Sequence, residues 1–261
     1  YVYFSEKGGC NIDLAHGKLY NIRGNAVFKV IKFSRCGAVL ALLLVVALAV
    51  GITSAICIPR AAPAAADNRV TLVIDAGHGG IDGGAVSAAG VKESEINLAI
   101  AKRLNSLAEL YGVRTHMTRV DDSSKSAAEG YSEHEDLVRR VEEINSAPNG
   151  VLMSIHQNCY PTSQPSGAQV LYSAYTGGEK LGKLCHANLI TYLDPSNRRV
   201  AEPASKGLYI TAHAKCPAIL VECGFMSNPG DVEKLCDGEY QTALASVLLA
   251  SFLQYTSGEK V

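Results

Sequence analysis

The sequence predicts an α/β fold: a single three-layer domain with a mostly parallel central sheet flanked by helices. From residue 70 onward, short apolar runs that fit buried strands alternate with stretches of helical periodicity, a pattern typical of parallel sheets. Three of the apolar runs end in or near His78, His156 and Glu222. Ligands gather at the carboxyl ends of strands in such sheets, so these three residues mark a candidate site.

The first predicted strand, residues 70–75, leads into a glycine-rich turn. This turn holds His78 between Gly77 and Gly79, and further glycines follow to Gly84. Glycine lets the backbone bend tightly and approach a ligand closely, so we expect His78 at the exit of the strand. The turn lacks the lysine of a phosphate-binding loop.

The next segment, residues 93–111, has apolar residues at helical spacing and acidic Glu93 and Glu95 in its first turn, where the helix dipole favours them. We expect the remaining elements in this order: a strand over 113–117, a surface loop over 121–132, a helix over 137–145, strands over 151–156 and 168–172, a helix over 178–193, a short strand over 207–210, a strand over 218–222 and a closing helix over about 240–255.

An uncharged segment precedes the domain. Its 22 residues, 37–58, would span roughly 30 Å as a helix, and the basic residues before it put the N-terminal side in the cytoplasm. We therefore expect a transmembrane helix as an anchor, with a cleaved signal peptide as the alternative. The expected organisation is a cytoplasmic segment over 1–36, the anchor over 37–58, a Pro/Ala linker over 59–69 and an extracytoplasmic catalytic domain over 70–256.

Composition excludes some classes of function. The net charge is -1, with 48% hydrophobic and 19% charged residues, so no basic excess indicates a nucleic-acid partner. Five of the eight cysteines follow residue 58 and none forms a CxxC pair, so no disulfide framework is implied. Cys159 and Cys223 neighbour the candidate site, and we expect both to be buried packing residues.

His78, Glu93 and His156 could supply the three protein ligands that a hydrolytic zinc site uses, with the fourth position left for water. They lie far apart in the sequence, so their spacing forms no compact motif, and each could instead be structural. Glu222 ends an apolar strand, where an unpaired charge is costly to bury. It could act as a general base or pair with a neighbouring Arg or Lys.

Six stretches of the domain together form an ordered pattern: 73–80 with 83–85, 90–93, 118–119, 137–145, 154–158 and 217–229. In this order they resemble the zinc-dependent N-acetylmuramoyl-L-alanine amidases of bacterial cell walls. The resemblance implies hydrolysis of the amide between N-acetylmuramic acid and L-alanine of the peptidoglycan stem peptide. Many family members have Pro where Ala76 stands and a small residue where Gln157 stands, but neither position is a ligand.

Carried over by position, the resemblance assigns roles to individual residues. It implies one zinc ion (Zn2+) per chain. The zinc ligands fall on His78, Glu93 and His156, the catalytic glutamate falls on Glu222, and Arg139, Asn158 and Asn228 are candidates for substrate-binding or supporting residues.

Two details resemble the spore-cortex branch of this family: the segment 130–141 and the segment 161–169 after the His156 strand. That branch removes whole stem peptides before muramic δ-lactam forms, and an activating lipoprotein is a candidate partner. Residues 157–167 leave no room for the inhibitory helix of division-controlled members. Two alternatives stay open: an inactive wall-binding homologue, and an amidase for soluble muropeptides in wall turnover or cell separation.

Overall fold

The computed structural model describes residues 10–13, 18–21, 69–126 and 130–258. The chain divides into two units, residues 1–66 and 67–261. The described part of the first unit is an antiparallel pair, β1 (Cys10–Asp13) and β2 (Lys18–Asn21). The predicted anchor over 37–58 lies outside the described residues. Among the helices that the structure does describe, none combines the length and apolar character needed to cross a bilayer.

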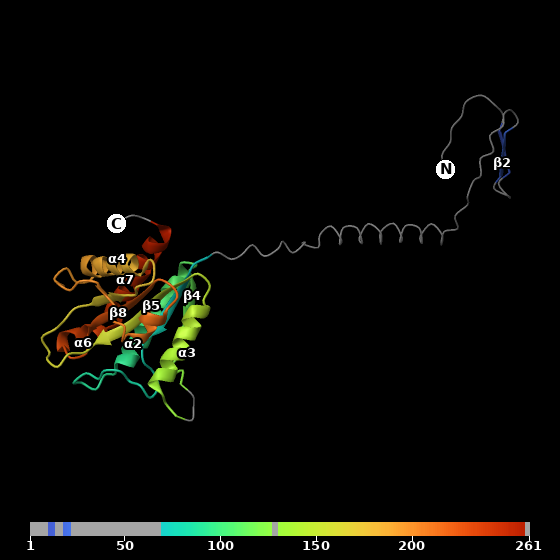
Figure 1. Cartoon of the computed structure of the whole chain (residues 1–261). Coiled ribbons are helices and arrows are strands. Elements are labelled where there is room, and N and C mark those ends of the chain that lie inside the picture. Colours follow the sequence, from blue (N-terminus) through green and yellow to red (C-terminus); the bar gives the residue numbers. More distant parts are fainter. Residues whose placement is uncertain (1–9, 14–17, 22–68, 127–129, 259–261) are drawn as a thin grey trace. The chain divides into compact units, whose positions relative to one another are not determined.

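The second unit, drawn with helices and strands in Figure 1, is built on a six-stranded sheet. The strand order is β4-β3-β5-β8-β6-β7. Every neighbouring pair is parallel except β6 and β8, which are antiparallel. The prediction of a mostly parallel sheet is therefore confirmed, and the sheet as a whole is mixed. The strands are β3 (Thr71–Ala76), β4 (Arg114–Met117), β5 (Gly150–Asn158), β6 (Gln169–Tyr172), β7 (Glu202–Pro203) and β8 (Ala218–Phe225).

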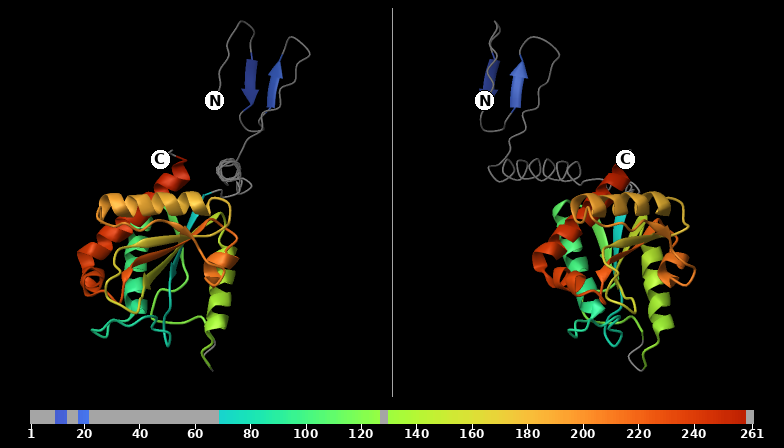
Figure 2. Two further views of the ribbon diagram at one scale, coloured as in Figure 1. Left: turned by 60° about the vertical axis from the view of Figure 1, so that its left-hand side comes forward. Right: turned by 90° about the vertical axis from the view of Figure 1, so that its left-hand side faces the viewer.

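Helices cover both faces of this sheet, which confirms the three layers (Figure 2). One face packs against α2 (Glu93–Leu110), α4 (Gly178–Tyr192), α6 (Pro229–Cys236) and α7 (Gly238–Ser257). The other face packs against α3 (Glu133–Ser146) and α5 (Tyr209–His213).

Strand β3 shows how the two cores are filled. Leu72, Ile74 and Ala76 belong to the larger apolar cluster beneath α2 and α7, whereas Val73 belongs to the smaller cluster beneath α3. Successive side chains of a strand point to opposite faces, and both faces of β3 are covered. Its nearly continuous apolar sequence follows from that double burial.

The structure differs from the prediction at residues 207–210, where the expected short strand does not form. Tyr209–His213 is instead the short helix α5. Ile210 and Ala214 are both buried in the cluster under α3, and their spacing of four residues places them on one face of a helical turn.

Helix α6 is absent from the sequence prediction, although its start carries a recognisable signal. Asn228 caps the helix, because its Oδ1 accepts a hydrogen bond from the Asp231 backbone N–H at 3.1 Å, and Pro229 occupies the first helical position. Helix α3 likewise begins earlier than predicted. Ser132 caps it by accepting a hydrogen bond from the Glu135 backbone N–H.

Five cysteines of the second unit are free: Cys159, Cys185, Cys216, Cys223 and Cys236. Cys223 is buried in the larger core, as expected. The corresponding prediction for Cys159 is wrong. Cys159 is exposed, because it follows the end of β5 and lies in the loop that leads to β6.

Candidate metal centre

Three predicted ligands come together at the carboxyl ends of β3 and β5, near the start of α2. His78 lies two residues beyond β3, Glu93 is the first residue of α2, and His156 lies near the end of β5. One ligand atom from each lies within 4.8 Å of the others. Glu93 Oε1 is 3.3 Å from His78 Nε2 and 3.1 Å from His156 Nδ1. Two imidazole nitrogens and a carboxylate oxygen form a donor set that suits zinc. We call these three residues the triad.

The His78 turn is fixed by its neighbours. His78 has a φ of 61°, in the left-handed region that residues other than glycine rarely adopt. Its Nδ1 lies 2.7 Å from Asp82 Oδ2, and the Tyr131 hydroxyl donates to the same oxygen at 3.2 Å. Because Asp82 engages Nδ1, Nε2 remains directed at Glu93. A carboxylate on the far nitrogen is the usual way a metal-binding imidazole is oriented.

Two glycines make room for the triad. A Cβ on Gly77 would lie 2.2 Å from Cε1 of His156, and a Cβ on Gly84 would lie 2.7 Å from Oε2 of Glu93. Gly84 also has a φ of 65°, which a residue with a side chain rarely adopts. The glycine-rich sequence after β3 therefore permits close packing around the ligands.

Glu93 is held by a complete set of donors. Its Oε2 accepts a hydrogen bond from the Ala85 backbone N–H, and its Oε1 accepts from Asn97 Nδ2 and the Gln157 backbone N–H. Burial alone would raise the pKa of Glu93, but the two triad histidines outweigh it and hold this pKa well below its usual range. Glu93 is therefore an ionised, oriented carboxylate, and its role goes beyond complementing the helix dipole.

His78 carries the opposite shift. Burial would lower its pKa, but the hydrogen bonds and negative charges of Glu93 and Asp82 outweigh burial and raise the pKa to about 9. A metal ligand must be the neutral imidazole, so metal binding at His78 competes with this proton.

Glu222 lies on β8 directly opposite His156 of β5. Its Oε2 is buried and has no hydrogen-bond partner among the residues that the structure describes. Burial raises the pKa of Glu222 to about 7. The alternative of an ion pair with Arg or Lys is not found in the described part of the chain. A buried carboxylate oxygen without a partner is costly, which makes Glu222 a candidate for proton transfer.

A buried ion pair between Arg140 and Asp75 stabilises the turn that holds His78. Arg140 of α3 donates to Asp75 Oδ1 at 3.0 Å and to the His78 carbonyl oxygen at 2.5 Å. Burial would raise the pKa of Asp75, but Arg140, together with the hydroxyls of Ser154 and Thr118, lowers it to about 2. Asp75 therefore remains charged, and the pair ties α3 to the end of β3.

The other candidate residues make their own contacts outside the triad, and their predicted substrate-binding or supporting role stays a prediction. Arg139 pairs with Glu135 at 2.6 Å on the exposed side of α3, and the structure does not bring it to the triad. Asn158 Oδ1 accepts from the backbone N–H of the next residue. Asn228 caps α6 and donates to the Ser163 carbonyl oxygen.

The sequence analysis assigned no supporting role to four residues that contact the triad or its neighbours: Asp82, Asn97, Arg140 and Gln157. Asn97 stands four residues after Glu93, the spacing that puts two side chains on one helix face. Arg140 and Arg139 are adjacent, so only the helical phase of α3 separates the buried residue from the exposed one. The Gln157 backbone N–H contacts Glu93 and its side chain donates to Asn97, contacts that no sequence spacing indicates.

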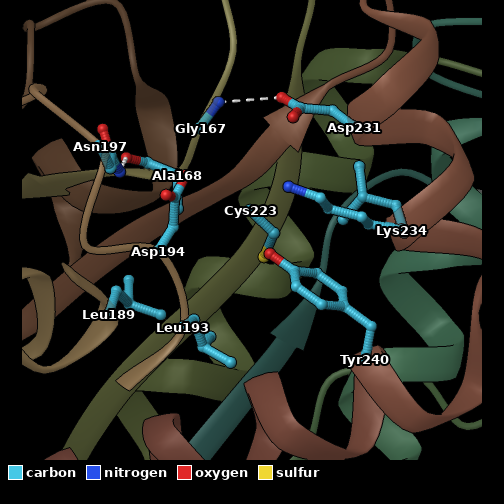
Figure 3. Close-up of a pocket in the computed structure, with 11 residues that line it drawn as sticks. Gly167, Ala168, Leu189, Leu193, Asp194, Asn197, Cys223, Asp231, Lys234 and Tyr240 are labelled. Atoms are coloured by element: carbon cyan, nitrogen blue, oxygen red, sulfur yellow. Dashed lines mark hydrogen bonds between the residues drawn. The ribbon is translucent and has the colours of Figure 1, made fainter. Parts of the chain in front are cut away.

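A cavity of about 40 Å³ opens beside the triad histidines, between the His78 turn and α3. Its lining includes Tyr131, Leu137 and Ile210. A second cavity, of about 10 Å³, is lined by Cys223 and Tyr240 and by none of the triad (Figure 3). It has room for about one water molecule and is too small to be a substrate site.

A strand-edge His-Glu-His set beside an unpaired carboxylate on an α/β sheet is the arrangement of a metal-dependent hydrolase. The family profile described as N-acetylmuramoyl-L-alanine amidase matches residues 72–252. The chain belongs to this family of zinc amidases.

Relatives of known name agree with this assignment. The germination-specific N-acetylmuramoyl-L-alanine amidase of Bacillus subtilis is 33% identical over 70% of this chain and 78% of the relative. The solved structure of the CwlD amidase from Clostridioides difficile in complex with the GerS lipoprotein is also 33% identical, with a TM-score of 0.69, and covers 72% of this chain and 99% of that one. Both relatives are in accord with the resemblance to the spore-cortex branch.

A further solved structure, the N-acetylmuramoyl-L-alanine amidase from Clostridium difficile 630, is 28% identical with a TM-score of 0.64. The match covers 74% of this chain and 100% of that chain.

Proposed function

We propose that this amidase cleaves the bond between N-acetylmuramic acid and the L-alanine of the stem peptide, with His78, Glu93 and His156 holding one zinc ion and Glu222 moving the proton. The observation that carries the proposal is the position of Glu222: its residue lies opposite His156 in the sheet, and its carboxylate oxygen Oε2 is buried without a partner among the described residues. His156 belongs to the triad, whose ligand atoms lie within 4.8 Å of one another.

Zinc, when bound, lowers the pKa of water and polarises a carbonyl oxygen. The protein supplies the rest. Asp82 and Glu93 orient the imidazoles of His78 and His156. Glu222 accepts a proton from the attacking water at its free oxygen and returns it to the leaving nitrogen of L-alanine. A carboxyl with a pKa near the working pH can do both steps, and burial moves Glu222 in that direction.

The biological setting is part of the same proposal. Two relatives support spore-cortex maturation, the process in which muramic δ-lactam forms: one is named germination-specific, and the other is CwlD. We place the catalytic domain outside the cytoplasm, in the cell wall or the space between the forespore membranes. The uncharged segment 37–58 supports a membrane anchor. The relative solved with a lipoprotein supports a lipoprotein partner for this chain.

The test uses purified residues 67–261, which form a separate compact unit. The domain is incubated with peptidoglycan, its metal content is measured, and the released fragments are read by mass spectrometry. One zinc per chain and release of peptides that begin with L-alanine are expected. Zinc without release from intact sacculi, but with release from soluble muropeptides, would favour the muropeptide amidase. If the domain neither contains zinc nor cleaves either substrate, the result would favour a wall-binding homologue.

A further inference from the structure

A row of polar side chains runs across the sheet from the triad to Arg199. Glu222 lies opposite His156 on one side and opposite Gln169 of β6 on the other. Residues directly opposite in paired strands present their side chains on the same face. Arg199 Nη1 donates to Gln169 Oε1 at 3.2 Å. Arg199 therefore lies on the Glu222 side of the site, beyond Gln169.

Arg199 is held in place before any ligand binds. Its backbone N–H donates to Asn197 Oδ1 at 3.0 Å, and its carbonyl oxygen lies 2.8 Å from His186 Nε2. Its guanidinium donates from Nε to the Ser166 carbonyl oxygen at 3.0 Å and stacks 4.3 Å from the centre of the Phe225 ring. A group fixed in this way loses little freedom on binding.

The turn that supplies the Ser166 carbonyl is itself fixed, as Figure 3 shows. The Gly167 backbone N–H donates to Asp231 Oδ2 at 2.9 Å, and Asn197 Nδ2 donates to the Ala168 carbonyl oxygen at 2.7 Å. Asn197 thus holds both this turn and the backbone of Arg199. The position of Arg199 therefore depends on several hydrogen bonds, of which the one from Asn197 to Ala168 is buried.

The charge of Arg199 is not neutralised by the bonds that hold it. Its acceptors are a carbonyl and an amide, and no carboxylate lies within ion-pair distance among the residues that the structure describes. Only two of its five N–H donors are engaged by these acceptors. Arg199 and Arg198 line an open hollow of about 350 Å³. Asp194 also lines it, but its Oδ1 accepts from Ser196.

We propose that Arg199 binds a carboxylate of the peptide part of the substrate, an inference that rests on the proposed function. An arginine with free donors in a fixed position matches a carboxylate by charge and geometry. The glycan offers no such group: its sugars are neutral, and the carboxyl of muramic acid is consumed in the scissile amide. The carboxylate must therefore come from the peptide.

The spacing of the sheet sets the reach. Gln169 lies opposite Glu222 on the neighbouring strand, one spacing of about 4.8 Å away. Arg199 Nη1 lies 3.2 Å from Gln169 Oε1, so the guanidinium is on the order of 10 Å from Glu222. An extended peptide advances about 3.3–3.6 Å per residue. A carboxylate on the second or third residue after the scissile amide can therefore reach Arg199.

The experiment compares two muramoyl-peptide substrates of the same sequence, one with free peptide carboxylates and one with every carboxylate converted to a carboxamide. Residues 67–261 are tested with the native sequence and as Arg199→Gln, Arg199→Lys and Arg103→Gln. Arg103 lies on α2 and donates to the Ala99 carbonyl oxygen, so its variant removes the same charge away from the site. KM and kcat are measured separately, and thermal melts check the fold.

We expect the native domain to bind the carboxylate substrate with a KM about 10- to 100-fold lower, the effect of one charge-assisted contact. Arg199→Gln should erase this difference with kcat retained, Arg199→Lys should restore part of it, and Arg103→Gln should keep it. Equal KM values for both substrates in the native domain would overturn the subsite. The subsite would also be overturned if Arg199→Gln raised KM equally for both substrates, because that result would indicate a structural role for Arg199. Cleavage of neither substrate by the native domain would reject the proposed function, and the subsite with it.

Discussion

Gly77 and His156 touch with no room for a side chain between them: a Cβ on Gly77 would lie 2.2 Å from Cε1 of the His156 ring. The residue before one ligand thus sets the position of another ligand that lies 79 residues later in the chain. The closeness of β3 and β5, which are paired neighbours, makes the geometry of the triad depend on a single hydrogen atom at position 77.

Replacing Gly77 by Ala should therefore displace the His156 ring. A misplacement of about 1 Å can reduce catalysis on the order of 100-fold, and zinc affinity should fall with it. Zinc titration and amide-release assays measure the two effects. Gly207→Ala is the matched control, because the nearest atom to its added Cβ is 3.7 Å away. Unchanged zinc affinity in Gly77→Ala would contradict the proposed role of His156 as a ligand.

Replacing Glu222 by Gln removes the proton acceptor and keeps the shape of the side chain. Turnover should fall on the order of 10²–10⁴-fold, with zinc content and melting temperature retained, because Glu222 is not one of the triad residues. Glu239→Gln, at an exposed position in α7, is the control for loss of one negative charge. Full turnover by Glu222→Gln would rule out the assigned proton transfer.

Asp82 should contribute to zinc binding through His78. The Asp82→Asn variant keeps the size of the side chain but weakens the contact to His78 Nδ1, now 2.7 Å. Loss of such a supporting partner costs about 10–100-fold in metal affinity. The affinity is measured by competition with a chelator. Asp121→Asn, at an exposed position, should match the native domain, and equal affinities in all three proteins would refute the role of Asp82.

The buried Asp75–Arg140 pair predicts a pH-dependent stability. The pKa of Asp75 is lowered to about 2 in the folded state, below its unfolded value near 3.9. The stabilisation is fully present above about pH 4 and is lost as the pH falls through about 2. At about 1.4 kcal/mol per pKa unit, the stabilisation amounts to roughly 2.6 kcal/mol.

Urea unfolding of the metal-free domain between pH 6 and pH 2 measures this effect. Asp75→Asn should lack this part of the slope and should be less stable at pH 6 by about 2–3 kcal/mol, because Arg140 loses the charge of Asp75 and keeps only Asp136 as a carboxylate partner. Asp121→Asn should retain the native slope. An Asp75→Asn curve parallel to the native curve would show that Asp75 does not carry the acid sensitivity.

Removal of the metal should abolish activity and leave the domain folded. Both apolar cores and the hydrogen bonds to Glu93 are formed by the protein alone. A chelated sample should therefore still unfold cooperatively, at a lower temperature than the zinc form because zinc binds only the folded state. Loss of the cooperative transition on chelation would mean that the metal is needed for folding.

The sequence predicted the sheet, the layers and the residues of the triad because each depends on local patterns. Apolar runs reveal buried strands, and the ordered family stretches locate His78, Glu93 and His156. The short helix α5 was mistaken for a strand because a run of four residues carries little periodicity. Asn228 and Pro229 did carry the start signal of α6, but the signal was interpreted only as a family motif.

The supporting contacts could not be predicted in the same way. Whether Arg139 or Arg140 faces the sheet depends on the phase of α3, which Ser132 sets by capping the helix earlier than expected. The contact of Arg199 with Gln169 requires β6 to run antiparallel to β8. The antiparallel direction of β6 is a property of the assembled sheet, and no local sequence pattern indicates it.

The distribution of the triad along the chain orders the events of maturation. His78 and Glu93 are synthesised well before His156, and β5 must pair with β3 before the three donors meet. A growing or partly folded chain in which this pair has not formed therefore offers incomplete chelation. Full-affinity capture of zinc would thus report the pairing of β3 with β5, two strands separated in the sequence by α2, β4 and α3.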